Sequence, residues 1–142
     1  AWRNLWFHTG DAGIRDENGL ITFVDRIKDC IRRRGENISA TEVENVVGQI
    51  PGIQEVAAYA VPADGPGNED EVMLALVASE GMILDPADIV RKATEMLPKF
   101  AKPRFVRLMD SLPKTATGKI QRTALRQQGS AGAYDADAPG SR

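Results

Sequence analysis

The sequence has little of what several common kinds of protein need. It holds one cysteine, Cys30, and one histidine, His8, which leaves it no internal disulfide and no histidine cluster for a metal or a nucleophile. No apolar run at its start has the length of a signal peptide or a membrane span. The formal net charge of -2 opposes nucleic-acid binding, which favours a basic surface. These absences predict a cytoplasmic protein with no nucleic-acid partner and no membrane span.

What the chain does contain favours one modest folded unit. Its 142 residues can support a single core, so we expect one domain of roughly 100 residues with irregular ends. The first residue is Ala1 rather than Met, and Trp2, Trp6 and Phe7 follow with little chain nearby to cover them. We therefore expect the sequence to be a segment of a larger protein, in which Trp2 and Trp6 belonged to an interface with the missing part.

The spacing of turn residues and apolar residues predicts an α+β fold, a small mixed sheet with packed helices that follows a β-hairpin. The turn at 16–19 lies between two β-rich runs and predicts the hairpin over residues 12–25. Helix-start signals stand at Ser39, which has Glu42 at capping-box spacing, and at Asp85. The other expected elements are strands at 30–34, 56–61, 72–77 and 105–109 and helices at 40–50, 86–97 and 119–128.

A turn aspartate and a later arginine form the first candidate site. Asp11 ends the tight turn Thr9-Gly10-Asp11, where a carboxylate can accept hydrogen bonds from two neighbouring hydroxyls of a sugar. A plain turn aspartate is the alternative. Arg26 follows fifteen residues later, on the other side of the predicted hairpin. The two residues are therefore candidates for nucleotide binding.

A basic run next to a glycine forms the second candidate site. Arg32, Arg33 and Arg34 stand directly before Gly35. Such a run is usually a solvated face, but guanidinium groups beside a glycine can also hold phosphates bidentately. The sequence leaves both interpretations open.

The third candidate is Lys119, which follows Gly118 at the start of a predicted helix. A P-loop is excluded, because its first glycine would fall at Pro113 and the residue after the lysine is Ile120 rather than Ser or Thr. We therefore expect Lys119 on a flexible loop without a preformed phosphate cradle. A lysine that only adds solubility is the alternative.

These segments occur together and in one order, and with them the chain resembles the superfamily of acyl-CoA synthetases, adenylation domains and luciferases. The resemblance covers residues 6–128 and depends on Thr9-Gly10-Asp11, on residues 25–29, on residues 34–38, and on residues 113–119 with Arg122. It implies three parts: the end of a large N-terminal AMP-binding domain at 1–26, a mobile C-terminal domain at 27–128 and a tail at 129–142. The composition of that tail predicts disorder.

The resemblance also implies a reaction in two steps. ATP and a carboxylic acid first give an acyl-adenylate and pyrophosphate, and a thiol then displaces AMP. Lys119 would be the catalytic residue of the first step, Asp11 and Arg26 would bind the ATP ribose, and Lys28 would be the hinge between the two domains. In the second step the loop Gly35-Glu36-Asn37 would replace Lys119 and line the tunnel for the pantetheine arm of CoA.

The loop around Gly35 resembles the form found in acyl-CoA ligases. Phe100, Lys102 and Arg104 match positions that contact the CoA nucleotide in some relatives, by stacking and by phosphate pairing. The alternative for Phe100 is that it closes the end of the preceding helix. The runs around Asp11 and Arg26 are similar to those of carnitine- or crotonobetaine-type CoA ligases.

The expected function is that of the C-terminal part of an AMP-forming carboxylic acid:CoA ligase. The expected partners are ATP and AMP, CoA, a carboxylic acid and the protein's own N-terminal domain. Mg²⁺ would be held mainly by the phosphates and by that domain, and the segment alone would be inactive. Two alternatives stay open: an adenylation domain that loads a carrier protein, and a non-catalytic binding module.

Overall fold

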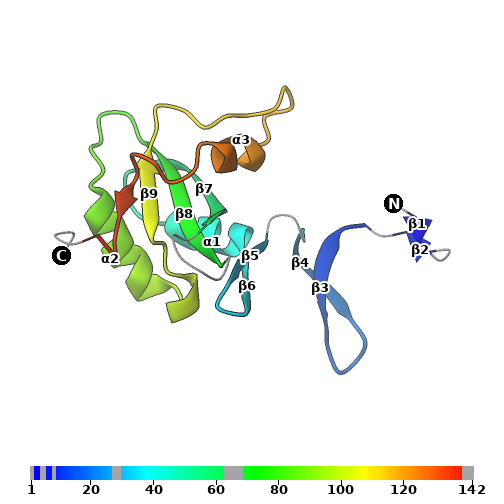
Figure 1. The fold of residues 1–142 in the computed structure, drawn as a ribbon. Helices are drawn as coiled ribbons and strands as arrows, with labels where there is room; N and C mark the ends of the chain where they lie inside the picture. Colours follow the sequence, from blue (N-terminus) through cyan, green and yellow to red (C-terminus); the bar gives the residue numbers. More distant parts are fainter. Residues whose placement is uncertain (1, 4–5, 8, 27–29, 63–68, 139–142) are drawn as a thin grey trace.

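The structure is a computed structural model that describes residues 2–3, 6–7, 9–26, 30–62 and 69–138 (Figure 1). In these ranges no helix is long and apolar enough to cross a membrane. The elements in chain order are β1 (Trp2–Arg3), β2 (Trp6–Phe7), β3 (Asp11–Arg15), β4 (Ile21–Arg26), β5 (Cys30–Arg33), β6 (Glu36–Ser39), α1 (Ala40–Val47), β7 (Ile53–Pro62), β8 (Asp70–Ala78), α2 (Pro86–Met96), the 3-10 turn η1 (Lys99–Ala101), β9 (Phe105–Leu108), α3 (Arg122–Gln127) and β10 (Tyr134–Asp135).

The main sheet has four strands in the order β10-β9-β8-β7. Strand β8 pairs antiparallel with β7 and parallel with β9, while β9 pairs antiparallel with β10. Every residue from Glu71 to Val77 of β8 is buried. A strand covered on both faces needs a continuous apolar run, and this is the run that the sequence shows. The predicted small mixed sheet with packed helices is confirmed.

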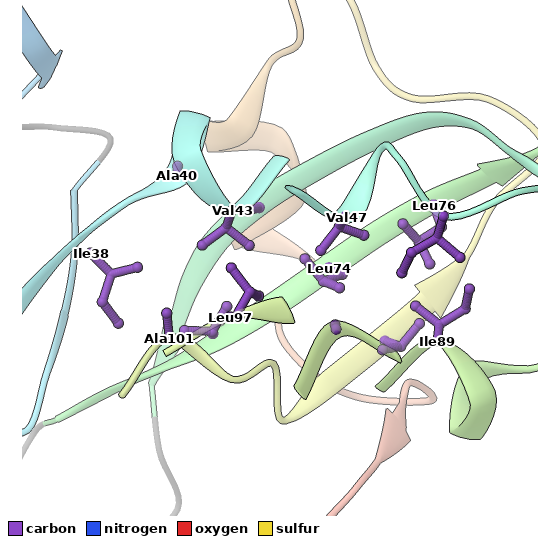
Figure 2. Close-up of a cluster of buried hydrophobic side chains, with 14 of the residues drawn as sticks. Ile38, Ala40, Val43, Val47, Leu74, Leu76, Ile89, Leu97 and Ala101 are labelled. Atoms are coloured by element: carbon purple, nitrogen blue, oxygen red, sulfur yellow. The ribbon is translucent and has the colours of Figure 1, made fainter. Parts of the chain in front are cut away.

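Helices α1 and α2 cover one face of this sheet. Figure 2 shows Val43 and Val47 of α1 and Ile89 of α2 gathered around Leu74 and Leu76 of β8. These side chains are almost fully removed from water. Burial of each is worth about 1.5–3 kcal/mol, so this layer supplies much of the stability of the domain.

Helix α3 covers the opposite face. Leu125 is the one fully buried residue of this helix, and it belongs to the cluster that also contains Tyr59, Met73 and Phe105. The alternation of side chains along β7 and β8 divides the two clusters between the faces, because successive residues of a strand point to opposite sides. Burial raises the pKa of the Tyr59 phenol.

The predicted helix starts are confirmed in detail. The Ser39 hydroxyl accepts a hydrogen bond from the Glu42 N–H at 3.2 Å, and the Asp85 carboxylate accepts one from the Ala87 N–H at 3.1 Å. Each bond satisfies one of the free N–H groups in the first turn of its helix. Helix α1 ends at Val47, three residues before the predicted end. From Gly48 onward the backbone forms the tight turns that connect the helix to Ile53, the first residue of β7.

Helix α3 begins at Arg122 and not at Lys119, where the sequence predicted it. The reason lies in the backbone hydrogen bonds before it. The Lys119 carbonyl accepts from the Thr115 N–H at 2.8 Å, and the Gln121 N–H donates to the Pro113 carbonyl at 2.8 Å. These groups are used to close a loop, so the first helical turn starts after them.

The β3–β4 and β5–β6 hairpins, which precede the main sheet, were predicted unequally. The hairpin expected over residues 12–25 is confirmed by the pairing of β3 with β4. The pairing of β5 with β6 was missed, because the prediction was a strand at 30–34 and a loop at Gly35-Glu36-Asn37, with no partner strand before the helix start at Ser39. Strand β6 leads directly into α1, so one short polar segment serves as strand and helix start in succession.

The disorder predicted beyond Gly129 is corrected for residues 129–138. Strand β10 pairs with β9 through Tyr134 opposite Val106 and Asp135 opposite Phe105. The composition of the tail is polar and small, but β10 adds to the open edge of the sheet. Arg104 also forms ion pairs with Asp135 and Asp137, and Arg107 donates to the Gly129 and Ala131 carbonyls, so these residues are ordered. The remaining tail residues, 139–142, lie outside the described ranges.

Candidate functional site

The structure brings Asp11 and Arg26 together at the open end of the β3–β4 hairpin. The two residues are cross-strand partners, and the Arg26 Nε lies 3.9 Å from an Asp11 carboxylate oxygen. The Asp11 N–H donates to the Thr9 hydroxyl at 3.2 Å. The side chain of Arg26 is 70% exposed and that of Asp11 is 40% exposed, so both remain accessible to a ligand. A carboxylate acceptor and a guanidinium that can donate bidentately therefore stand side by side, a pair that suits hydroxyl and phosphate groups of a ligand.

Lys119 lies in a closed turn that runs from Lys114 to Ile120, which form an isolated antiparallel bridge. The Thr115 hydroxyl accepts from the Lys119 N–H at 3.1 Å and contacts the Thr117 hydroxyl at 2.9 Å. Gly118 has φ +81°, a left-handed conformation that suits glycine, and nothing lies within 4 Å of the space for its missing side chain. The sequence predicted a flexible loop, whereas the structure shows a turn with its own hydrogen-bond network.

The ammonium group of Lys119 contrasts with the other cations near this turn. Its side chain is exposed, and within the described part of the chain its Nζ makes no hydrogen bond or ion pair. Lys114, at the start of the turn, instead pairs with Glu55 of β7 at 2.7 Å. The turn thus holds one cation against the sheet and presents another to solvent.

Arg122 secures the other end of the turn. Its Nη2 donates to both Glu44 carboxylate oxygens at 2.8 and 2.7 Å, and its Nε lies 3.2 Å from one of them. The same Glu44 oxygen accepts the Ala58 N–H of β7 at 2.9 Å. Sequence reasoning missed Glu44 and Glu55. Their only sequence signal was an acidic residue among apolar positions of a helix or strand, which does not identify a partner.

The β5–β6 hairpin turns at Arg34 and Gly35. Their φ angles are 51° and 80°, and two positive φ values at the central residues define the type I′ turn of a two-residue hairpin. No atom lies within 4 Å of the space that a Gly35 side chain would enter. Glu36 and Asn37 are exposed in β6 beside this turn. The glycine is therefore required by the backbone here, and the space around it is open.

The basic run before Gly35 does not form one surface. Arg33 is 7% exposed, and its Nε lies 2.7 Å from the Glu71 carboxylate of β8, at an angle that makes the contact an ion pair rather than a hydrogen bond. Its Nη1 donates to the carbonyls of Lys102 at 2.9 Å and Phe100 at 3.3 Å. Both interpretations of the run, a solvated face and a phosphate site, are therefore wrong for Arg33. The contacts join the Gly35 hairpin to the segment that carries Phe100 and Lys102.

Arg104 is occupied within the chain. It donates to both carboxylate oxygens of Asp135 at 3.0 and 3.1 Å, lies 3.5 Å from Asp137, and stacks over the Phe105 ring at 4.7 Å. The hydrogen bonds raise the pKa of the Arg104 guanidinium and lower the pKa of the Asp135 carboxyl. Arg104 would have to leave Asp135 to reach a CoA phosphate, whereas Phe100 keeps an exposed side chain.

An open hollow of about 940 Å³ borders the Lys119 turn. Its lining includes Phe23 and Arg26 of β4 together with Lys119 and Arg122. Its volume suits a small-molecule ligand, and the cations that border it favour an anion. The hinge predicted at Lys28 lies outside the described residues.

The described residues do not favour a resident metal ion. They contain no group of three His, Cys, Asp or Glu side chains placed to hold one.

The fold and these loops have a counterpart among known proteins. Residues 42–119 match the model of the AMP-binding enzyme C-terminal domain. The chain therefore belongs to the family of AMP-binding enzyme C-terminal domains. The resemblance to the adenylate-forming superfamily is confirmed.

Individual relatives of this chain include CoA ligases. The probable CoA ligase CCL9 of Humulus lupulus is 42% identical over 127 residues, 89% of this chain and 24% of that protein. A crotonobetaine/carnitine–CoA ligase of Salmonella arizonae is 37% identical over 124 residues, 87% of this chain and 23% of that protein. ATP-bound MatB of Rhodopseudomonas palustris has a TM-score of 0.74 at 31% identity, over 86% of this chain and 24% of that chain. The chain spans about a quarter of the length of the curated relatives that it matches.

Proposed function

We propose that this chain acts as the C-terminal part of an ATP-dependent carboxylic acid:CoA ligase. The observation that carries the proposal is the exposed Lys119, held on a closed turn beside a hollow that Arg26 also lines. Family membership and the names of the relatives, which are CoA ligases of several acids, support it. They favour CoA over a carrier protein as the thiol partner, and a catalytic role over a binding module.

In the proposed first step, a carboxylate oxygen of the acid attacks the α-phosphorus of ATP. The bond from that phosphorus to the pyrophosphate oxygen breaks, and the products are acyl-adenylate and pyrophosphate. Lys119 contacts the carboxylate and the α-phosphate and stabilises the negative charge that develops there. Asp11 accepts hydrogen bonds from the ribose hydroxyls while Arg26 contacts the same ribose and its phosphate. A cation and an anion about 4 Å apart interact by roughly 4 kcal/mol at an effective dielectric constant near 20.

In the proposed second step, the CoA sulfur attacks the acyl carbon, and AMP leaves with the electron pair of the broken carbon–oxygen bond. The Gly35 hairpin, with Glu36 and Asn37, replaces the Lys119 turn at the site and lines the path of the pantetheine arm. Phe100 and Lys102 are the proposed contacts for the CoA nucleotide. The exchange of one loop for the other needs a hinge, which we propose at Lys28.

The proposed function carries further expectations about the whole protein. Its partners are ATP, CoA, a carboxylic acid and its own N-terminal domain, which the first 26 residues would join. That domain and the phosphates would hold Mg²⁺, and the cytoplasm is its proposed location. We place the acid pocket in the N-terminal domain, so the proposed activity belongs to the full-length protein.

Lys119→Ala in the full-length protein tests this proposal. Loss of an electrostatic contact of this kind should slow carboxylate-dependent exchange between pyrophosphate and ATP by about 10² to 10³-fold. Thioester formation from supplied acyl-adenylate and CoA should stay near the wild-type rate, because the lysine serves the first step alone. Lys92→Ala, on the exposed side of α2, is the control and should change neither rate. If both half-reactions of Lys119→Ala fall together, or neither falls, the assignment of Lys119 is wrong.

A further inference from the structure

Each of the two loops assigned to a half-reaction is attached to the core by its own arginine–glutamate pair. Arg122 stands three residues after Lys119 and binds Glu44, and the two side chains are 19% and 15% exposed. Arg33 stands two residues before Gly35 and binds Glu71, with side chains 9% and 12% exposed. Surface ion pairs such as Arg91 with Glu95, whose side chains are 62% and 66% exposed, lie elsewhere in the domain.

The Glu44 carboxylate joins three elements at one point. It receives the Arg122 guanidinium of α3 through contacts of 2.7, 2.8 and 3.2 Å and the Ala58 N–H of β7 at 2.9 Å, while Glu44 itself belongs to α1. A guanidinium bound in this forked way has one orientation, since its donors are fixed in a plane. The direction in which the chain enters α3 from the Lys119 turn is thereby restricted.

Arg33 joins three elements at the other loop. It contacts Glu71 of β8 at 2.7 Å and donates to the carbonyls of Lys102 and Phe100 from the η1 segment. Arg33 also faces Glu36 across the turn that Gly35 closes. The base of the Gly35 hairpin is therefore attached to the sheet and to the proposed CoA segment at the same time.

Stability alone does not account for these two pairs. The cost of removing two charges from water can exceed their attraction, and apolar residues of similar volume often stabilise a protein as well or better. Arg122 binds Glu44 through a fork of donors, whereas Arg33 combines its ion pair to Glu71 with hydrogen bonds from Nη1 to two carbonyls. In both cases several fixed contacts leave the guanidinium, and the loop that it holds, a single orientation. We propose that Arg122–Glu44 and Arg33–Glu71 are two separate positioning pairs, the first orienting Lys119 for adenylation and the second orienting the Gly35 hairpin for thioester formation. This inference rests on the function proposed for the two loops.

Arg122→Lys and Arg33→Lys, made separately in the full-length protein, test the inference. Lysine keeps the positive charge but loses the planar set of donors, which is the fork to Glu44 at Arg122 and the simultaneous contact with Glu71 and two carbonyls at Arg33. Each loop should therefore be displaced without an unpaired carboxylate being left behind. A misplacement of about 1 Å can cost about 10²-fold in rate, so we expect a loss of at least about tenfold in the half-reaction that each loop serves. Arg122→Lys should slow pyrophosphate exchange and leave thioester formation from acyl-adenylate near wild type. Arg33→Lys should do the reverse.

A positioning role predicts that the two variants slow different half-reactions, whereas a general structural role predicts that each variant slows both. If each variant slows both half-reactions by the same factor, or neither, the inference is overturned. Glu44→Gln and Glu71→Gln change the carboxylate of the same pairs. Glu44→Gln should slow pyrophosphate exchange alone and Glu71→Gln should slow thioester formation alone. These variants test the inference if an arginine variant fails to fold. Arg91→Lys repeats the same chemical change in an exposed pair and should alter neither rate.

Lys119→Ala, measured in the same assays, distinguishes a failure of the positioning inference from a failure of the proposed function. If Lys119→Ala separates the half-reactions while Arg122→Lys and Arg33→Lys do not, the positioning inference alone is overturned. If Lys119→Ala also fails to separate them, the proposed function and the inference fall together.

Discussion

Arg32, Arg33 and Arg34 are adjacent in the chain and lie in three different environments. Arg32 is exposed, Arg33 is buried against Glu71, and Arg34 occupies the first central position of the turn with φ 51°. Side chains alternate between the faces of a strand, so neighbouring residues of one type meet opposite surroundings. A charge run is therefore an uncertain guide to a ligand site until the strand that carries it has been placed.

Gly35 gives a prediction at this scale. Gly35→Val should lower the free energy of unfolding by about 1–2 kcal/mol, because a β-branched side chain is strained in the left-handed region. Gly35→Asn should cost less, since asparagine tolerates that region and the surrounding space is open. Urea denaturation of the two variants measures the difference. Equal losses would contradict the assignment of the cost to the positive φ.

At the scale of elements, β10 shows how little is needed to order a polar tail. Its two residues complete the sheet edge beside β9, and the Ala136 N–H donates to the Arg104 carbonyl at 2.9 Å. The Arg104–Asp135 pair fixes the strand from the side chains as well. The Asp135 carboxylate is one contributor to the stability of this element, and its contribution depends on pH.

The pKa of Asp135 is lowered from its ordinary value of 3.8 by the hydrogen bonds from Arg104. A depressed folded-state pKa means that the stabilisation is complete above the ordinary value and is lost as the pH falls through the lower, folded value. Asp135→Asn should therefore reduce the free energy of unfolding by about 1 kcal/mol at neutral pH, a modest figure because the pair is partly exposed. The difference from wild type should shrink below about pH 4. Denaturation across pH, with amide exchange at Ala136 as a local probe, measures both; a difference independent of pH would contradict the assignment.

At the scale of the whole molecule, the sheet separates two layers with different tasks. The α1 and α2 layer holds the larger core, whereas the α3 layer holds the helix that follows the Lys119 turn. Leu125 is fully buried and is the main apolar contact of α3 with the sheet. The orientation of the Lys119 turn thus depends on the smaller of the two cores.

Leu125→Ala should cost about 2–5 kcal/mol of unfolding free energy, because a buried leucine is removed and a cavity remains. Ile83→Ala removes a similar side chain that is 96% exposed and should change stability by less than about 0.5 kcal/mol. Thermal unfolding of both variants makes the comparison. Similar midpoints for the two would mean that α3 is not held by Leu125.

The sequence by itself determined the elements whose signals are local. The hairpin over residues 12–25, the helix starts at Ser39 and Asp85, and the buried run of β8 depend on turn chemistry, capping and continuous apolarity, each complete within a few residues. The candidate residues at Asp11, Arg26, Gly35 and Lys119 came from short motifs and their resemblance to a family. Their roles in catalysis stay predictions until the half-reactions are measured.

Only the tertiary structure decided which charges are free to act and which are used to hold the fold. The pairs Arg33–Glu71, Arg104–Asp135 and Arg122–Glu44 join residues 38, 31 and 78 positions apart in the chain, and nothing local indicates such partners. The strength of an ion pair depends on burial and on the direction of the donors, and both arise only when distant segments pack together. Lys119 was a candidate from its motif, but its exposure beside an anchored Arg122 is a property of the folded domain.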